Sequence, residues 1–495
     1  MRTTEIEDAK ERTQAIKLDG NALILASAGT GKTHLIIQKL VQLAKNNNSF
    51  KKLAVITYTD KAANELKARV ENRDIGSRVV SQTMHNWIMK EIITPFVNNC
   101  YILPTDIPIK YSFKTEISGF EEGIQHIQKN AEIGSDRNKK KDFAFQLALK
   151  ILSESNSAQR YLKATYSWIF VDEYQDVNGN QHALIKFIVE KLKIKAFIVG
   201  DNKQQIFNFR GSDTAYLEDF MDDQSFTKFE LTHNFRSNQE IVAYSRLFDD
   251  KYIFSSGYSQ FTGEAVINVN PHKNSLKEIV NKIKSEKTLE SILILKTTNN
   301  SIEELKQSDA IFDNFQTKVR LTYAESIHSD IFSLLIRILY RYEGIYSLQK
   351  YIEEALLHKN FSHISNIIEK FNNSGDLEAA SQLLQLVGIV SEMNFSQDEA
   401  EMFSQVVSDD GQVKYVLGVA AQYMILTVHG AKGLEADHVI VDPSEFLFDG
   451  RFDQQKHYVA ITRAKKKLWL MNDNLTYKNI VKVLVQKDSE LPSET

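Results

Sequence analysis

The chain has 495 residues, which at roughly 100–200 residues per domain corresponds to about three or four domains. A composition of 42% hydrophobic and 25% charged residues with one cysteine, Cys100, excludes a disordered chain, a collagen-like fibre and a disulfide scaffold, and it fits a reducing compartment. The formal net charge of −4 gives no overall attraction for nucleic acid, so any nucleic-acid site must be a local groove.

The N-terminal segment, residues 1–10, is charged and has no apolar core, so we expect no signal peptide. The longest apolar stretch, residues 415–428, falls short of the roughly 20 residues that a membrane span requires. We therefore expect a soluble, cytoplasmic protein without a membrane partner.

Short apolar runs along the chain are continuous rather than alternating, which is typical of buried parallel strands. They lie at residues 22–26, 53–57, 168–171, 196–199, 292–295, 424–428, 438–441 and 468–471. Each is flanked by an amphipathic helical pattern, so the sequence predicts an α/β unit at each end of the chain. Residues 88–165 and 330–410 show no strand pattern, and we expect both to be helical insertions.

A glycine-rich turn follows the first predicted strand and leads into a helical pattern, which is the context of a phosphate-binding loop. Backbone N–H groups of residues 28–32 would wrap a phosphate at the helix N-terminus, although a chance glycine-rich turn is the alternative. Lys32 would reach the β- and γ-phosphates of a bound nucleotide, and Thr33 would ligate Mg²⁺. The predicted loop comprises Ala26, Ser27, Ala28, Gly29, Thr30, Gly31, Lys32 and Thr33.

Polar residues also follow two later strands, and they would project from the same sheet edge. Asp172 could hold Mg²⁺, and Glu173 could polarise the attacking water. Gln204 could bond the γ-phosphate or that water. An acidic turn or a surface turn is common in itself, but the combination with Lys32 predicts ATP and Mg²⁺ as ligands.

Two arginines, Arg236 and Arg463, lie in or at the border of the second α/β unit. Phosphoryl transfer from ATP needs positive charge on the γ-phosphate, which arginine supplies. Arginines on a facing domain would make closure depend on nucleotide. An isolated arginine is more often one half of a surface ion pair, so this prediction depends on the other motifs.

Together these segments resemble the superfamily 1 helicases of the UvrD, Rep and PcrA type. The motifs are ASAGTGKT (26–33), AVITYTDKAANELKARV (54–70), QTMHNW (82–87), FVDEYQD (170–176), VGDNKQQIFNFRG (199–211), LTHNFRS (231–237), ILTVHGAKGLEADHVIV (425–441) and YVAITRAKKKLWL (458–470). The resemblance implies two RecA-like P-loop NTPase domains with parallel sheets and two small helical insertions. The implied divisions are domain 1A at 1–87 and 166–230, insertion 1B at 88–165, domain 2A at 231–329 and 415–486, insertion 2B at 330–414, and a flexible tail at 487–495.

The resemblance also implies residue roles and 3′→5′ translocation on single-stranded DNA. Gln14 matches an adenine-reading glutamine, Phe235 an aromatic that stacks on adenine, and Glu435 a carboxylate that meets the ribose. Arg236 and Arg463 match the γ-phosphate arginines. The positions that match single-strand DNA contacts are Tyr58, His85 and Phe209, and aromatic side chains of this kind stack on bases of any sequence.

Some positions depart from the family pattern. Phe207 and Phe209 replace the usual Trp or Tyr, and Ala436 replaces a phenylalanine. Residues 453–457 read DQQKH, where a stretch of acidic and arginine residues is usual. These changes leave ATP hydrolysis credible but put domain coupling and strand separation in doubt.

The small insertions, the short lead to Gln14 and the run at 140–152 resemble the helicase-like subunits of the Gabija anti-phage systems. That resemblance implies a heteromeric complex with a separate OLD-family nuclease subunit. Two functions stay open: a DNA-dependent ATPase that translocates on single-stranded DNA, or a sensor of nucleotide and DNA ends that regulates a nuclease without unwinding. A fused nuclease is disfavoured, because only about 25 residues follow Leu470, whereas a domain needs on the order of 100.

Overall fold

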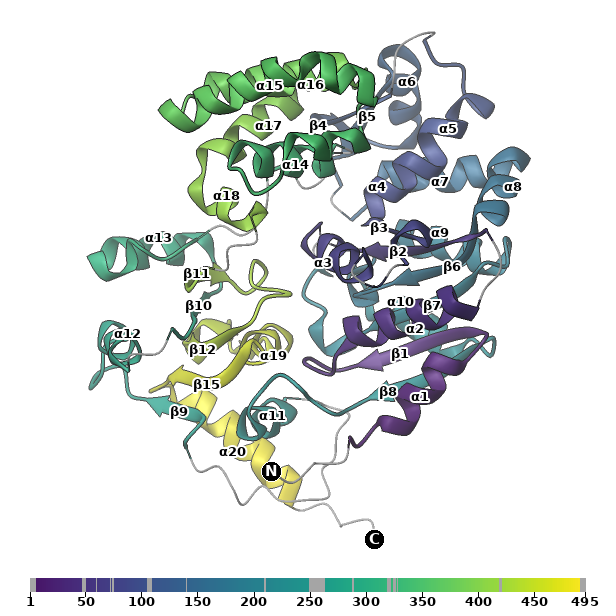
Figure 1. Cartoon of the computed structure of the whole chain (residues 1–495). Coiled ribbons are helices and arrows are strands. Elements are labelled where there is room, and N and C mark those ends of the chain that lie inside the picture. The colour runs from purple at the N-terminus through teal and green to yellow at the C-terminus, as the bar shows by residue number, and fades with distance from the viewer. Residues whose placement is uncertain are drawn as a thin grey trace.

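The computed structural model describes residues 6–489 except 47–49, 59, 72, 74, 105–108, 139, 209–210, 249–262, 287–288, 318–321, 324–325, 327 and 418–420. Two α/β lobes lie side by side, and two insertions stand above them (Figure 1). The predicted fold class, two RecA-like parallel-sheet domains, is confirmed by the sheet topology.

The first sheet has six parallel strands in the order β3-β2-β6-β7-β1-β8. Alternate residues of a strand point to opposite faces. Accordingly, Leu23 of β1 packs into one hydrophobic core, whereas Ala22 and Ile24 pack into another on the opposite face. The strands are β1 (Asn21–Ala26), β2 (Lys52–Thr57), β3 (Val79–Thr83), β6 (Tyr166–Val171), β7 (Lys195–Gly200) and β8 (Phe226–Leu231).

The second sheet has five parallel strands in the order β11-β10-β12-β15-β9. It is also buried on both faces, because Leu293 and Leu295 of β10 line one core and Ile292 and Ile294 line another. The strands are β9 (Val266–Val269), β10 (Ile292–Lys296), β11 (Tyr423–Thr427), β12 (Ala436–Val441) and β15 (Ala464–Met471), and a short hairpin pairs β13 (Leu447–Phe448) with β14 (Arg451–Phe452).

Helices flank both sheets, as the alternating sequence pattern predicts. Around the first sheet lie α1 (Ala9–Lys17), α2 (Lys32–Asn46), α3 (Asp60–Glu71), α9 (Gly179–Glu190) and α10 (Thr214–Asp222). Around the second lie α11 (Gln239–Arg246), α12 (Leu276–Ser285), α13 (Asn299–Ser308), α19 (Gln454–Ile461) and α20 (Leu475–Ser489). Helix α20 includes residues 487–489 of the predicted tail, and the rest of that tail lies outside the described residues. Among the described helices, none combines the length and the apolar character of a membrane span.

The first insertion contains a βαβ unit in addition to its helices, so the expectation of a purely helical segment is wrong. Strands β4 (Lys110–Ile117) and β5 (Glu132–Asp136) pair in parallel, and α6 (Phe120–Asn130) connects them. Both strands are rich in polar residues, which is why a search for continuous apolar runs misses them. Helix α4 (Met84–Ile88) leads into the insertion, whose other helices are α5 (Thr94–Phe96), α7 (Phe143–Glu154) and α8 (Asn156–Thr165).

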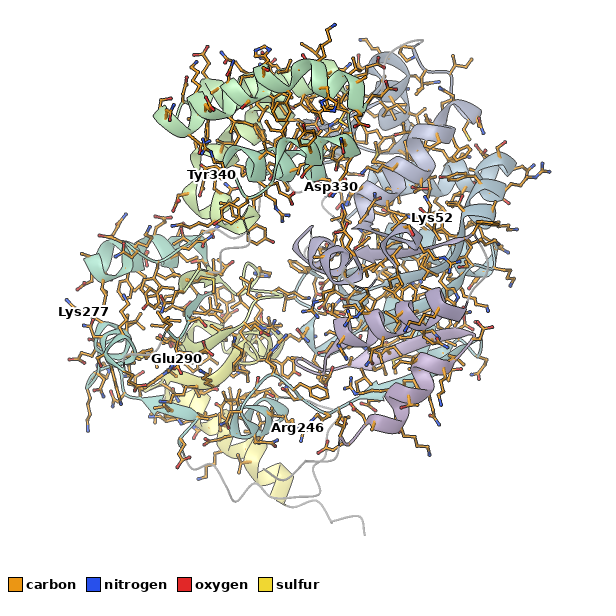
Figure 2. The ribbon with its side chains drawn as sticks, viewed as in Figure 1. Lys52, Arg246, Lys277, Glu290, Asp330 and Tyr340 are labelled. Carbon is orange, nitrogen blue, oxygen red and sulfur yellow. The ribbon has the colours of Figure 1, made fainter. Side chains whose placement is uncertain are left out.

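The second insertion is helical, as predicted, and buries a hydrophobic core of its own. It contacts the first insertion, because Lys90 Nζ lies 3.8 Å from Asp330 Oδ2. Beside this contact, Asn86 Nδ2, just before the first insertion, donates to Ser329 Oγ, just before the second, at 3.0 Å. Asp330 lies on the side of the second insertion that faces the first (Figure 2). The helices are α14 (Ser329–Leu339), α15 (Glu354–Ser374), α16 (Leu377–Val390), α17 (Gln397–Ser408) and α18 (Asp410–Val416).

Candidate nucleotide site between the two sheets

The order of strands in the first sheet gathers the predicted site residues at one edge. Strand β7 lies between β6 and β1, and all three run parallel, so their carboxyl ends share that edge. The phosphate-binding loop follows β1, the Asp172–Glu173 pair follows β6, and the 3₁₀ turn Asn202–Gln204 (η5) follows β7. Ligands of open α/β sheets bind outside the carboxyl ends of the strands.

The predicted loop, Ala26 to Thr33, includes the first two residues of α2, which begins at Lys32. Lys32 Nζ donates to the carbonyl of Ala26 at 3.3 Å and lies 3.8 Å from Glu173 Oε1. Thr33 is half-buried in the first turn of α2. The loop therefore presents the amino end of a long helix, a lysine and a threonine to the same space, which suits a phosphate.

The loop is also held from outside by the segment that follows β8. Asn234 Nδ2 donates to the carbonyl of Ala28 at 2.8 Å, and the backbone N–H of Phe235 donates to the carbonyl of Gly29 at 2.9 Å. Gly29 has a φ of 75°, and a Cβ there would lie 2.6 Å from Asn234 Nδ2 and 2.9 Å from the Cβ of Arg236. Gly29 therefore meets both a conformational and a steric requirement.

We expect Gly29→Ala to lower the ATPase rate by about 10-fold or more and to destabilise the loop by about 1–3 kcal/mol, because a β-carbon at this φ is strained and displaces the segment after β8. Steady-state hydrolysis and thermal unfolding measure both effects. Gly344→Ala is a matched control, since φ there is not positive and nothing lies within 4 Å of its added Cβ. An unchanged ATPase rate in Gly29→Ala would contradict the role given to this glycine.

The two strand-end carboxylates differ in charge state. Burial raises the pKa of Asp172, and the negative charge of Glu173 raises it further, although Lys32 acts against both. Burial also opposes ionisation of Glu173, but Lys32 and Lys432 outweigh it and hold the pKa of Glu173 well below its ordinary value. Gln175 Nε2 donates a short hydrogen bond to Glu173 Oε2. Glu173 is thus an anion at neutral pH.

Gln204 is buried in the η5 turn and is held from both domains. Its Nε2 donates to Asp201 Oδ2 at 2.5 Å, and its Oε1 accepts from Arg463 NH2 at 2.9 Å. Arg463 is 2% exposed, and burial together with Arg236 lowers its pKa to about 10, so it remains a cation at neutral pH. The structure therefore joins the predicted Gln204 and Arg463, which come from different sheets.

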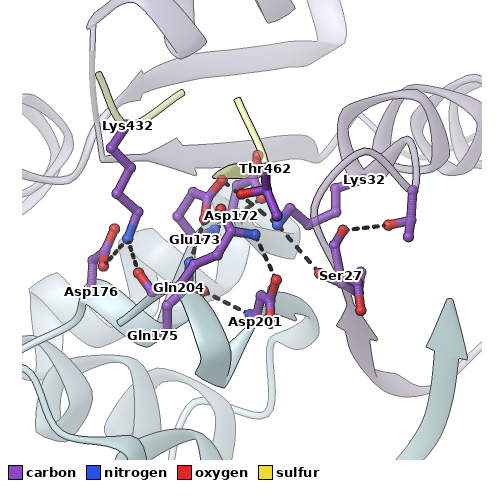
Figure 3. Close-up of polar contacts among 12 residues, drawn as sticks. Ser27, Lys32, Asp172, Glu173, Gln175, Asp176, Asp201, Gln204, Lys432 and Thr462 are labelled. Carbon is purple, nitrogen blue, oxygen red and sulfur yellow. Dashed lines mark hydrogen bonds and ion pairs between the residues drawn. The ribbon is translucent and has the colours of Figure 1, made fainter. Parts of the chain in front are cut away.

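A second cation, Lys432, reaches the site from the second domain. Its Nζ lies 2.5 Å from Asp176 Oδ1 and donates to the carbonyl of Gln204 at 2.6 Å (Figure 3). Burial and Glu173 raise the pKa of Asp176 to about 6, against the effect of Lys432. Since Lys432 and Asp176 are 256 positions apart, this buried pair directly links the two lobes.

Arg236 and Glu435 contact each other. Arg236 Nε lies 2.6 Å from Glu435 Oε2, and Arg236 NH1 donates to the carbonyl of Thr462 at 3.5 Å. Both residues thus lie where the two lobes meet, beside Arg463. The predicted γ-phosphate arginine and the predicted ribose carboxylate form an ion pair here.

The face of α1 toward the loop carries Arg12 rather than Gln14. Arg12 pairs with buried Asp8, its NH2 donates to the carbonyl of Thr30 at 2.8 Å, and its guanidinium lies 5.0 Å from the Phe235 ring centroid. Gln14 is exposed, and residues two apart on a helix do not share a face. The predicted contact of Gln14 with the base therefore stays a sequence prediction. The side chain of Phe235 lies beside the loop and is 55% exposed.

The predicted DNA contacts fall on a neighbouring part of the same edge. Tyr58 follows β2, and its ring stacks on Phe207, with centroids 5.8 Å apart. His85 Nε2 lies 2.9 Å from Asp142 Oδ2, and its ring meets Phe145 edge-on at 4.9 Å. Phe209 lies outside the described residues.

Sequence reasoning missed several contacts of this site. Lys432, Asp176 and Asn234 stand inside the quoted motifs but received no role, because nothing in a linear sequence shows which residues meet across lobes. Asp8 and Arg12 had a usable signal: with buried Ala15 they follow a spacing of four and three residues, which marks one helix face.

No group of three or more His, Cys, Asp or Glu side chains in the described part of the chain could hold a metal ion by itself. A hydroxyl and one carboxylate, Thr33 and Asp172, nevertheless fit Mg²⁺, which typically binds through few protein ligands together with substrate phosphates. A phosphate-binding loop, with cations from a second parallel-sheet domain bonded to the neighbouring turn and acidic segment, is typical of a two-domain P-loop nucleotide hydrolase.

Comparisons with known proteins agree with this class. The AAA domain family matches residues 10–210, and the UvrD-like helicase C-terminal domain family matches residues 423–471. The chain is 30% identical to the Gabija protein GajB of Bacillus cereus (strain VD045), over 96% of this chain and 98% of that protein. It is 23% identical to the ATP-dependent DNA helicase PcrA of Staphylococcus epidermidis, over 93% of this chain and 83% of that protein. The chain is also 24% identical to a probable DNA helicase II homolog of Mycoplasma genitalium, over 93% of this chain and 84% of that protein.

The chain therefore belongs to the UvrD-like helicases and, among them, to the family of the Gabija protein GajB. It is an ATP-hydrolysing enzyme of the helicase class. The resemblance read from the motifs is confirmed.

Proposed function

We propose that this chain is the DNA-dependent ATPase of a Gabija-type anti-phage complex and that it hydrolyses ATP while it binds or translocates on single-stranded DNA. The observation that carries the proposal is the contact of Arg463 with Gln204, which brings a cation of the second lobe to the turn η5 of the first, where its charge also interacts with Glu173. We place the lobes and insertions at the divisions expected from the sequence.

Hydrolysis would proceed in the space between the loop and the turn η5. A water oxygen bonds to the γ-phosphorus as the bond to the β–γ bridging oxygen breaks, and the products are ADP and phosphate. Glu173, an anion at neutral pH, orients that water and accepts its proton. Mg²⁺, held by Thr33 and Asp172 with the phosphates, would neutralise phosphate charge and would also favour the ionised form of Asp172.

Cations from both lobes would then stabilise the charge of the transferring phosphoryl group. Lys32 acts from the first lobe. Arg463 reaches the γ-phosphate while it is bonded to Gln204, and Arg236 reaches it by exchanging its contact with Glu435 for the nucleotide. Released in this way, Glu435 is available to the ribose hydroxyls, and exposed Phe235 offers a face to the base.

The same contacts provide a route from DNA to the nucleotide. Phe207 stacks on Tyr58, lies 5.1 Å from Lys432 Nζ and lies 5.7 Å from the His429 ring. Lys432 in turn bonds Asp176 and the Gln204 carbonyl. A base that stacks on Tyr58 would therefore act on a cluster that already touches the nucleotide site. The directionality, 3′→5′, is proposed from family membership.

The partner we propose is an OLD-family nuclease subunit in a heteromeric complex. The second candidate function is a sensor that binds nucleotide and DNA ends and regulates that nuclease without unwinding. The family departures at Phe207 and at Ala436 favour it, because they lie in or beside the contacts between lobes.

The test combines two measurements on the full-length chain. ATP hydrolysis is measured with and without single-stranded oligonucleotide, and strand displacement is measured on a duplex with a 3′ overhang. Stimulated hydrolysis with displacement supports the translocating enzyme, and stimulated hydrolysis without displacement supports the sensor. Hydrolysis that never responds to DNA would contradict both candidate functions. Tyr58→Ala, compared with Tyr342→Ala on the exposed surface of the second insertion, tests whether the response requires the aromatic pair.

A further inference from the structure

Lys203 extends from the turn after β7 to the phosphate-binding loop and has no part in the roles assigned above. Its Nζ donates to Ser27 Oγ at 2.9 Å, although the two residues are 176 positions apart. Ser27 is the first residue after β1, where the loop leaves the sheet. Lys203 therefore brings a second ammonium group to a loop whose own lysine is Lys32.

The register of the sheet explains this placement. Leu25 of β1 is paired with Gly200 of β7, so Ser27 and Lys203 emerge two and three residues beyond a matched pair. Strand β7 also lies between β1 and β6. A phosphate that spans from the loop to Asp172 and Glu173 therefore crosses the end of β7, from which Lys203 projects.

The turn directs the side chains of Lys203 and Gln204 to different partners. Asp201 Oδ1 accepts from the backbone N–H of Lys203 at 3.2 Å, and Asp201 Oδ2 accepts from Gln204 Nε2 at 2.5 Å. Gln204 then bonds Arg463 of the second lobe, whereas Lys203 bonds the loop. Asp201 therefore fixes the backbone of Lys203 and the side chain of Gln204, and the bond to Ser27 positions the ammonium of Lys203 before nucleotide binds.

We propose that Lys203 binds the γ-phosphate of ATP as a second lysine and stabilises its charge during hydrolysis. This inference rests on the proposed ATPase function. The ammonium group has three donors and accepts nothing, so anionic phosphate oxygens are stronger partners for it than the hydroxyl of Ser27. ADP lacks the γ-phosphate, so Lys203 distinguishes the triphosphate from the diphosphate.

The test compares Lys203→Ala with Lys228→Ala, an exposed lysine on β8 of the same sheet, in the full-length chain. Calorimetry measures binding of ADP and of a non-hydrolysable ATP analogue, both with Mg²⁺. We expect Lys203→Ala to weaken binding of the analogue by about 10- to 100-fold and to lower kcat by a similar factor, while ADP affinity stays within about twofold. Lys203→Arg should recover part of the loss, and Lys228→Ala should match the wild type.

Two results would overturn the role of Lys203. One is unchanged binding of the analogue and unchanged kcat in Lys203→Ala. The other is an equal loss of affinity for ADP and for the analogue, which would mean that the lysine only supports the loop. A wild-type chain that hydrolyses no ATP would instead refute the proposed function, so the two failures are distinguishable.

Discussion

Replacing Arg463 with alanine is expected to lower kcat for ATP by about 10³-fold or more, because an arginine that stabilises the transferring phosphoryl group contributes roughly 10³–10⁵ to the rate. The substitution also removes the donor to Gln204 Oε1, which is one of the bonds between the lobes at this turn. Since this contribution arises mainly in the transition state, we expect the affinity for ADP to change little. Steady-state kinetics and ADP titration measure the two effects.

The Arg463→Lys variant distinguishes a loss of catalytic rate from a loss of folding stability. It keeps a positive charge in a buried position but loses the fork that now bonds Gln204, Thr462 and the carbonyl of Val459. We expect it to fold with a melting temperature near that of the wild type and to recover only part of the rate. Wild-type kcat in a folded Arg463→Ala variant would refute the assignment of this residue.

Replacing Glu173 with glutamine is expected to lower kcat by about 10²–10⁴-fold, the range of a positioned general base. The change is nearly isosteric, but it removes the anion that lies 3.8 Å from Lys32 Nζ and accepts from Gln175. ATP should still bind, because Lys32 and the loop are intact, so the variant should accumulate the ATP-bound state. Binding of a fluorescent ATP analogue beside single-turnover hydrolysis would show this combination.

The matched control for this substitution is Glu190→Gln, which makes the same chemical change away from the nucleotide site. Glu190 ends α9 and pairs with Lys186 at the surface. Glu190→Gln should behave as the wild type in both assays, since a surface ion pair on a helix contributes little. Rapid single-turnover hydrolysis by Glu173→Gln would show that another group activates the water.

The interior strands of each sheet and the edge strand β11 could be predicted from the sequence, and the other three edge strands could not. Central strands such as β1, β7 and β12 are buried on both faces and therefore read as continuous apolar runs. The strands β3, β8 and β9 lie at sheet edges, where exposed or half-buried positions interrupt the pattern. The same physical cause hid the two polar strands of the first insertion.

Some features of the candidate site could likewise be predicted from the sequence, and others could not. The loop residues and the strand-end carboxylates could be located because a strand, a turn and a helix are local features that leave a local pattern. The contacts of Lys432 with Asp176 and of Lys203 with Ser27 depend on which strands become neighbours, and that is decided by the whole fold. Which of Arg12 and Gln14 faces the loop depends on the phase of one short helix, because a shift of two residues turns a side chain to the opposite face.

The central claim is that one nucleotide is held between the two lobes and is touched by cations from both. The most direct measurement is a crystal structure of the chain with Mg²⁺ and a non-hydrolysable ATP analogue. We expect a γ-phosphate within hydrogen-bond reach, about 3 Å, of both Lys32 and Arg463, with the Mg²⁺ beside Thr33 and Asp172. A nucleotide bound at the loop with Arg463 remote from its γ-phosphate, or bound elsewhere altogether, would contradict the claim.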